Sequence, residues 1–124
     1  MEELNIVKNY MDRREFRNYV TTMLSKHNYE IIKIDDVRVS DEDKYNNNDI
    51  IVKKDNKKYT VQTFLNKEIT DKEIEETLKD MDKENVSYGL IVTNFNVNDD
   101  IKNKAQEQKI TILDREDFGN GIYN

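Results

Sequence analysis

The sequence predicts an α/β fold, in which a mixed β-sheet of about five strands is flanked by helices. Two observations carry this prediction. Two segments with helical spacing of apolar residues each begin with a capping-box pattern. Five short segments rich in β-branched or aromatic residues are bounded by Asn, Asp and Gly. Strands joined by tight turns are expected to pair antiparallel, and strands joined through helices to run parallel.

Size and composition favour one domain over residues 1–124, with a core over about residues 12–118. Apolar residues make up only 35% of the chain, so seven Tyr and four Phe must supply much of the bulk of the core. The absence of cysteine excludes a disulfide framework and a thiolate metal site. The sequence contains no long apolar run and no signal-peptide pattern at its start, so we expect a cytoplasmic protein without a membrane segment.

The first half of the chain is expected to form a helix followed by three strands. The helix covers about residues 12–27, where Asp12 and Glu15 have capping-box spacing. The strands cover residues 29–34, 49–53 and 58–65. Residues 35–48 are polar, with a brief strand at 37–39, and residues 55–56 form a turn between the last two strands.

The second half alternates helices and strands. A helix over 71–84 follows the capping box of Thr70 and Glu73, and a strand at 88–93 is apolar enough to be buried on both faces. A short helix from residue 99 to about 108 and a strand at 110–113 follow. The tail after residue 113 has a turn-like composition.

The register of the predicted hairpin brings two polar side chains together. A turn at 55–56 pairs Lys54 with Lys57 and therefore sets Asp49 opposite Gln62, with both side chains on the same face of the sheet. A turn one residue longer would shift this register. A carboxylate and a carboxamide are hard oxygen donors, and such donors suit Mg²⁺ or Mn²⁺.

The order of elements resembles the PD-(D/E)xK restriction-endonuclease superfamily, most closely the Mrr-type catalytic domain. The resemblance covers about residues 12–118. It is carried by Glu15-Phe16 in the first helix, Asn28-Tyr29-Glu30 after it, Asn48–Val52, Tyr59–Phe64, Tyr88–Thr93 and Ile110–Asp114. It implies a restriction-endonuclease-like sheet and a nuclease site on the two hairpin strands.

In that family an Asp and a Glu or Gln hold a divalent metal ion, and a lysine two residues further on positions or activates the attacking water. The resemblance assigns the metal-binding roles to Asp49 and Gln62, with Mg²⁺ or Mn²⁺ as cofactor if the site is active. The lysine position is occupied by Phe64, and Asn46–Asn48 replace the glycines that usually precede the Asp. We therefore expect a degenerate, catalytically inactive site, with Phe64 filling the former cleft.

Each candidate residue also has a simpler explanation. Asp49 can begin a strand, and Gln62 can face solvent. Lys67 can replace the missing lysine only if the chain folds back after the strand, and Glu15 can either face the site or cap its helix. His27 ends a helix, where a cation is favourable. The acidic loop at residues 41–43 can be an ordinary solvated loop.

Three interpretations therefore stay open. The first is a pseudo-nuclease domain that binds a protein partner, a second copy of the chain, or DNA. The net charge of −6 and the pI of about 4.9 disfavour DNA unless a local basic face is present. The second is an active Mg²⁺- or Mn²⁺-dependent DNA endonuclease with a relocated lysine. The third is an unrelated α/β protein with the same order of elements.

Overall fold

The computed structural model describes residues 13–34 and 50–117. Their elements in chain order are α2 (Arg13–Lys26), β1 (Glu30–Ile34), β2 (Ile50–Lys54), β3 (Lys57–Phe64), α3 (Asp71–Glu84), β4 (Tyr88–Thr93), α4 (Asp99–Glu107) and β5 (Ile110–Leu113). The bounds of α3, β4 and β5 are those predicted, and the other elements differ by one residue at one or both ends. The predicted strand at 37–39, the cap at Asp12 and the tail beyond residue 117 lie outside the described residues.

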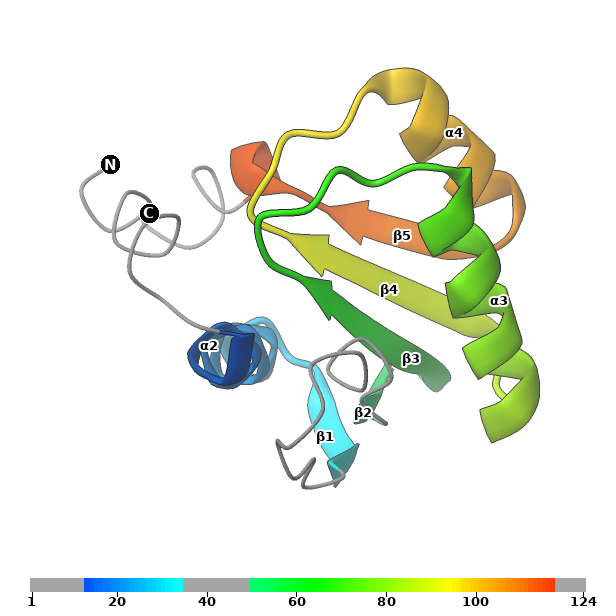
Figure 1. The fold of residues 1–124 in the computed structure, drawn as a ribbon. Coiled ribbons are helices and arrows are strands. Elements are labelled where there is room, and N and C mark those ends of the chain that lie inside the picture. Colours follow the sequence, from blue (N-terminus) through cyan, green and yellow to red (C-terminus); the bar gives the residue numbers. More distant parts are fainter. Residues whose placement is uncertain (1–12, 35–49, 118–124) are drawn as a thin grey trace.

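The five strands form one mixed sheet in the order β1-β2-β3-β4-β5 (Figure 1). The first three strands pair antiparallel, and β3, β4 and β5 run parallel. Helix α2 covers one face of the sheet, and α3 and α4 cover the other. The predicted α/β fold with a mixed, helix-flanked sheet is therefore confirmed.

Two apolar clusters hold these layers together. The cluster between α2 and the sheet, here called the α2-side core, contains Phe16, Val20, Met23, Leu24, Ile50, Val52, Val61, Leu90 and Val92. The cluster under α3 and α4, here called the α3-side core, contains Phe64, Ile69, Ile74, Met81, Ile91, Ala105, Ile110 and Ile112. Successive residues of the central strands alternate between the two clusters, as the pleat requires.

The hairpin between β2 and β3 has the two-residue turn that the sequence predicts. Asp55 and Asn56 have φ angles of 52° and 64°, as a type I′ turn requires, and Asp and Asn tolerate this region better than most residues do. Lys54 pairs with Lys57, and the same register continues to Ile50 opposite Val61. The register that underlies the site prediction is therefore confirmed as far as Ile50.

The helix ends follow the capping rules. Thr70 Oγ1 accepts a hydrogen bond from the backbone of Lys72, and Glu73 Oε1 accepts one of 2.7 Å from the backbone N–H of Thr70. The left-handed residue Asn85 follows the end of α3, and Asn98 caps α4 through the N–H of Ile101. These local signals explain why the second half of the fold could be read from the sequence.

A buried carboxylate secures the far edge of the sheet. Asp114 is 1% exposed, accepts a hydrogen bond from the N–H of Val97, and lies 2.9 Å from the ammonium of Lys102. It also caps a single helical turn at residues 115–117, where the sequence predicted only a turn. Burial alone would raise the pKa of Asp114, but these hydrogen bonds and the Lys102 charge outweigh burial and lower it.

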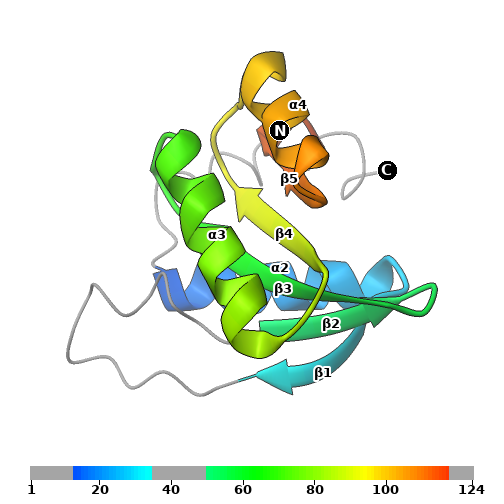
Figure 2. The same cartoon turned by 90° about the vertical axis from the view of Figure 1, so that its right-hand side faces the viewer.

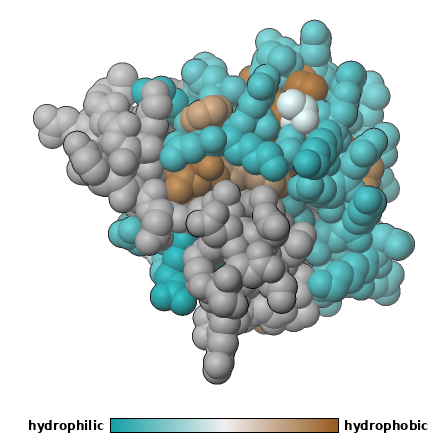
Figure 3. All heavy atoms as spheres, viewed as in Figure 1, coloured by the Kyte–Doolittle hydropathy of each residue, from teal (hydrophilic) through white to brown (hydrophobic). Residues whose placement is uncertain are grey.

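The described part of the surface is largely hydrophilic on the side shown in Figure 3. Ile32, on the edge strand β1, is the exposed large apolar side chain among the described residues, at 45% exposure. Within residues 13–34 and 50–117, no helix has the length and apolar character needed to cross a membrane.

Gly89 on β4 allows α3 to approach the sheet closely. A Cβ atom at this position would lie 2.8 Å from Thr77 Cγ2 and 3.1 Å from Met81 Sδ. Thr77 is fully buried and β-branched, so its methyl group has little freedom to move away.

We predict that Gly89→Ala lowers the free energy of unfolding by about 1–3 kcal/mol, because the added methyl overpacks this contact. Urea denaturation measures the change, and Ser87→Ala on the exposed surface nearby serves as the control. Thr77→Ser removes the obstructing methyl and keeps the hydroxyl that bonds Glu73 O. If the double variant shows the full sum of the single losses, the steric explanation is wrong.

Candidate functional site

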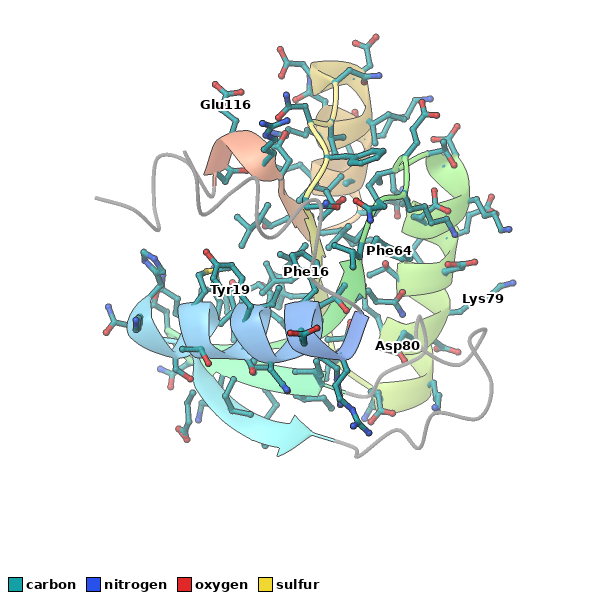
Figure 4. The ribbon with its side chains drawn as sticks, turned by 60° about the vertical axis from the view of Figure 1, so that its left-hand side comes forward. Phe16, Tyr19, Phe64, Lys79, Asp80 and Glu116 are labelled. Atoms are coloured by element: carbon teal, nitrogen blue, oxygen red, sulfur yellow. The ribbon has the colours of Figure 1, made fainter. Side chains whose placement is uncertain are left out.

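Gln62 and Phe64 lie on the same face of β3, the face that α3 covers. They are two residues apart, and Phe64 belongs to the α3-side core. Gln62 is 2% exposed and Phe64 is 1% exposed. The alternative that Gln62 faces solvent is therefore wrong, and the aromatic ring at position 64 fills apolar space, as predicted. Figure 4 shows Phe64 between the sheet and α3.

Asp49 lies outside the described residues. The described register ends at Ile50 opposite Val61, and Gln62 is the next residue of β3. If the register continues by one more residue, Asp49 comes opposite Gln62. The pairing of these two side chains stays a prediction.

Lys67 folds back toward position 64 after β3 has ended. Asn66 has a φ of 56° and is held by two hydrogen bonds to the side chain of Asn94, of 2.7 and 2.9 Å. This reversal brings Lys67 Nζ to 5.5 Å from the centroid of the Phe64 ring. The chain folds back after β3, which is the condition under which Lys67 could replace the missing lysine, and a catalytic role for Lys67 stays a prediction.

The Lys67 ammonium is also paired with a buried carboxylate. Its Nζ lies 3.2 Å from Glu73 Oε2, and the Glu73 side chain is only 2% exposed. Burial by itself would raise the pKa of Glu73. Hydrogen bonds from the backbone and hydroxyl of Thr70 and the charge of Lys67 outweigh burial, so the pKa of Glu73 is lowered. Glu73 is therefore a structural anion at neutral pH, and Lys67 is its counterion.

Glu15 is not brought to this site. It is exposed in the first turn of α2, and α2 packs on the opposite face of the sheet from Gln62 and Phe64. His27 is exposed just beyond the end of the same helix. The acidic loop at 41–43 lies outside the described residues.

Sequence reasoning missed a polar layer between β3 and α3. Glu73, Glu76 and Asp80 have the i, i+3, i+7 spacing that places side chains on one side of a helix. In Figure 4, Asp80 lies on the inner side of α3, whereas Lys79 points away from the sheet. The spacing of these acids was the available signal, but an acidic stripe on a helix usually indicates a solvated face.

Several oxygens of this layer are buried without a hydrogen-bond partner among the described residues. They are Thr60 Oγ1 and Gln62 Oε1 on β3, and Glu76 Oε2 on α3. Because α3 runs back along β3 from Glu73, we infer that Glu76 comes roughly level with these strand residues. A buried polar atom without a partner costs about 1–3 kcal/mol, so these oxygens do not add to the stability of the fold as they stand among the described residues.

The described residues supply oxygen donors that could bind a metal ion, but they do not form a complete metal site. Gln62 Oε1 is a hard oxygen ligand with no other partner among them. Within residues 13–34 and 50–117, however, no group of three or more His, Cys, Asp or Glu side chains is arranged to hold a metal ion. A metal ion bound here would need ligands from outside these ranges, of which Asp49 is the predicted one.

One family model, described as a restriction endonuclease (Mrr_cat), matches residues 8–121. The chain belongs to the Mrr-type restriction endonuclease family. No curated protein and no solved structure matches it. Restriction-endonuclease-like domains generally use divalent metal ions, so Gln62 of this Mrr-type domain retains a residue type suited to the family's cofactor, whereas Phe64 cannot donate a hydrogen bond.

We predict that Glu73→Gln lowers the free energy of unfolding by about 1–2 kcal/mol at pH 7, because the amide accepts hydrogen bonds but carries no charge for Lys67. The folded pKa of Glu73 lies below its ordinary value of 4.5. The stabilisation it provides is therefore complete above that value and is lost as the pH falls through the folded pKa.

Urea titrations at a series of pH values between neutral and strongly acidic would measure this difference. Glu75→Gln on the exposed side of the same helix is the matched control, with an expected change within about 0.5 kcal/mol. A difference between wild type and Glu73→Gln that stays constant down to strongly acidic pH would show that the charge of Glu73 is not its source.

Proposed function

We propose that this Mrr-type domain no longer cleaves phosphodiesters and acts as a binding module. The observation that carries the proposal is the burial of its site. Gln62 and Phe64, at the ligand and lysine positions of the family pattern, are 2% and 1% exposed. The Phe64 ring packs with Ile69, Ile74 and Ile91 in the α3-side core.

The chemistry of hydrolysis explains why this matters. A metal ion that lowers the pKa of a bound water must be in contact with both solvent and the phosphate, and a nearby cation offsets the charge that develops. A phenyl ring at position 64 supplies neither a proton donor nor a charge. Among the described residues, Gln62 itself is 2% exposed, so little of its side chain is open to a phosphodiester.

One observation favours the second candidate function, an active Mg²⁺- or Mn²⁺-dependent DNA endonuclease. Lys67 Nζ lies over the Phe64 ring and is thus close to where the family's lysine would begin. Against this candidate, the ammonium already pairs with Glu73, whose charge it neutralises in a buried setting. Moving Lys67 to a phosphate would leave that buried carboxylate without its counterion, which is costly.

The partner of the module is also part of this proposal. The net charge of −6 opposes contact between most of the surface and a nucleic acid, so a protein or a second copy of the chain is the partner that the overall charge favours. DNA would have to bind at a local face where lysines collect.

We predict that the wild-type chain does not nick supercoiled plasmid with Mg²⁺ or with Mn²⁺, and that Asp49→Ala and Lys67→Ala behave in the same way. Agarose gels after long incubation would measure this, with a known metal-dependent nuclease to show that the plasmid can be cut. Lys79→Ala, which removes a lysine that points away from the sheet, is the matched control.

Nicking by the wild type and by Lys79→Ala, together with its loss in both Asp49→Ala and Lys67→Ala, would contradict the proposal. That pattern would establish an active endonuclease in which Lys67 replaces the missing lysine. Nicking that survives Asp49→Ala would instead indicate a contaminating nuclease.

A further inference from the structure

The hairpin between β2 and β3 concentrates positive charge in an acidic chain. Residues 53–58 contain four lysines and one aspartate, which gives a formal charge of +3 (four minus one), whereas the whole chain carries −6. Lys54 pairs directly with Lys57 across the two strands, and Lys53 pairs with Lys58. Like charges placed directly opposite each other destabilise a sheet.

Among the described residues, Glu30 on β1 lies opposite Lys53 in the sheet register, but Lys54 and Lys57 take part in no ion pair. Lysines elsewhere in residues 13–34 and 50–117 form ion pairs, among them Lys67, Lys102 and Lys104, whereas no hairpin lysine does. The chain contains 26 Asp and Glu residues, so carboxylates were available for such pairing. Lysines placed opposite each other without an acidic partner, as Lys54 and Lys57 are, break a rule of sheet stability, and departures of this kind are typical of functional surfaces.

Three tyrosines form a row beside these lysines. The ring centroids of Tyr29 and Tyr59 are 5.8 Å apart in an edge-to-face arrangement, and those of Tyr59 and Tyr88 are 5.4 Å apart. All three side chains are half-buried. The row therefore forms a rigid support that crosses from the start of β1 to the start of β4.

Lysine ammoniums lie over the rings of this row. Lys54 Nζ is 4.7 Å from the centroid of the Tyr29 ring, and Lys57 Nζ is 5.4 Å from that of Tyr88. Lys109, from the turn before β5, approaches the same Tyr88 ring at 5.8 Å. Cation–π contacts of this kind hold the ammoniums in place without neutralising them. We call the six residues the tyrosine–lysine face: Tyr29, Lys54, Lys57, Tyr59, Tyr88 and Lys109.

This face is separate from the candidate nuclease site. Tyr59 packs against the α2-side core, whereas Phe64 lies in the α3-side core. The two residues are also five positions apart on β3, or roughly 17 Å along the strand. Figure 2 shows the hairpin projecting beside the end of α2, at the end of the sheet from which β3 starts.

We propose that the tyrosine–lysine face binds the phosphate backbone of a nucleic acid. Three neighbouring ammoniums and the phenol groups beside them match a series of phosphates, for which lysine is a point-charge ligand and tyrosine a hydrogen-bond donor. Burial, together with Tyr59 and Asp55, raises the pKa of Tyr29, so its hydroxyl keeps the proton that it would donate. Contacts of this type fix position and carry no sequence information.

A nucleic acid suits this face better than an acidic protein does. Duplex DNA carries one charge per about 1.7 Å of its axis, so a small patch of lysines meets several phosphates at once. An acidic protein with dispersed charge would present fewer anions to the patch. The proposal concerns a surface distinct from the retired site, so it holds or fails independently of the nicking result.

The test measures fluorescence anisotropy of labelled oligonucleotides, single-stranded and duplex, of about 20 nucleotides per strand, across a range of NaCl concentrations. The protein is the full chain, as wild type and as Lys54→Gln/Lys57→Gln. The matched control is Lys53→Gln/Lys58→Gln, which removes the same charge from the same hairpin on the opposite face of the sheet.

We expect wild type to bind at low salt and Lys54→Gln/Lys57→Gln to bind at least about 10-fold more weakly. The slope of log K against log salt should become less negative by about 1.8 for duplex or about 1.4 for single-stranded oligonucleotides, because two phosphate contacts are lost. The control pair should lose much less affinity. Circular dichroism and thermal melting of each variant establish that the fold is retained.

Outcomes of three kinds would overturn the proposal. One is the absence of oligonucleotide binding by folded wild type at low salt. Another is an equal loss of affinity in the two lysine pairs, which would mean that net charge rather than this face governs binding. The third is tighter binding of a polyglutamate peptide, or a salt-sensitive dimer that only Lys54→Gln/Lys57→Gln dissociates, because either would identify a protein as the partner.

Discussion

The register of β3 is the constraint on which the rest of the molecule depends. This strand lies at the centre of the sheet, paired antiparallel with β2 and parallel with β4. Its last five residues, 60–64, are all buried. The positive φ angles of Asp55 and Asn56 set the register, and the pleat then directs Gln62 and Phe64 toward α3. A shift of the β3 register by one residue would turn its side chains to the opposite face of the sheet. The apolar side chains of each core would then point to the other side.

Within that register, the residue type at position 64 determines whether the position supplies a charged group or fills apolar space. A lysine there would place a charge among Ile69, Ile74 and Ile91, unless the helices moved apart to admit solvent and substrate. Burial of a phenylalanine side chain contributes about 1.5–3 kcal/mol to the free energy of unfolding, and the Phe64 ring fills space in the α3-side core. The neighbouring oxygens of Thr60 and Gln62, buried without a partner among the described residues, gain nothing from this packing.

Much of the fold could be predicted because its signals are local. The capping box at Thr70, the left-handed turn at 55–56 and the apolar run of β4 each depend on neighbours in the chain. The register also followed from the turn, so the face shared by Gln62 and Phe64 was predicted correctly. The depth of burial of Gln62 was not, because alternation gives a side chain's direction and not what covers it.

The interactions that sequence reasoning missed all join distant segments. The reversal that brings Lys67 to Glu73 depends on Asn94, which is 28 residues away from Asn66. The tyrosine row likewise joins residues 29, 59 and 88, and its lysines come from both sides of the hairpin and from the turn before β5. The topology of the sheet brings these segments together, and no local pattern in the sequence predicts the contacts between them.

Positive charge is concentrated at the β2–β3 hairpin, although the chain as a whole is acidic. The lysines Lys54 and Lys57 lie together at an end of the sheet where no described ion pair neutralises them. At physiological ionic strength the Debye length is only about 8 Å, so a polyanion at the hairpin is largely screened from carboxylates farther away. The total of −6 therefore opposes approach from most directions without preventing contact at the tyrosine–lysine face. If a polyanion binds there, electrostatics of this kind sets its orientation more than its affinity, and the opposed lysines, which weaken the hairpin, are the structural cost of that orientation.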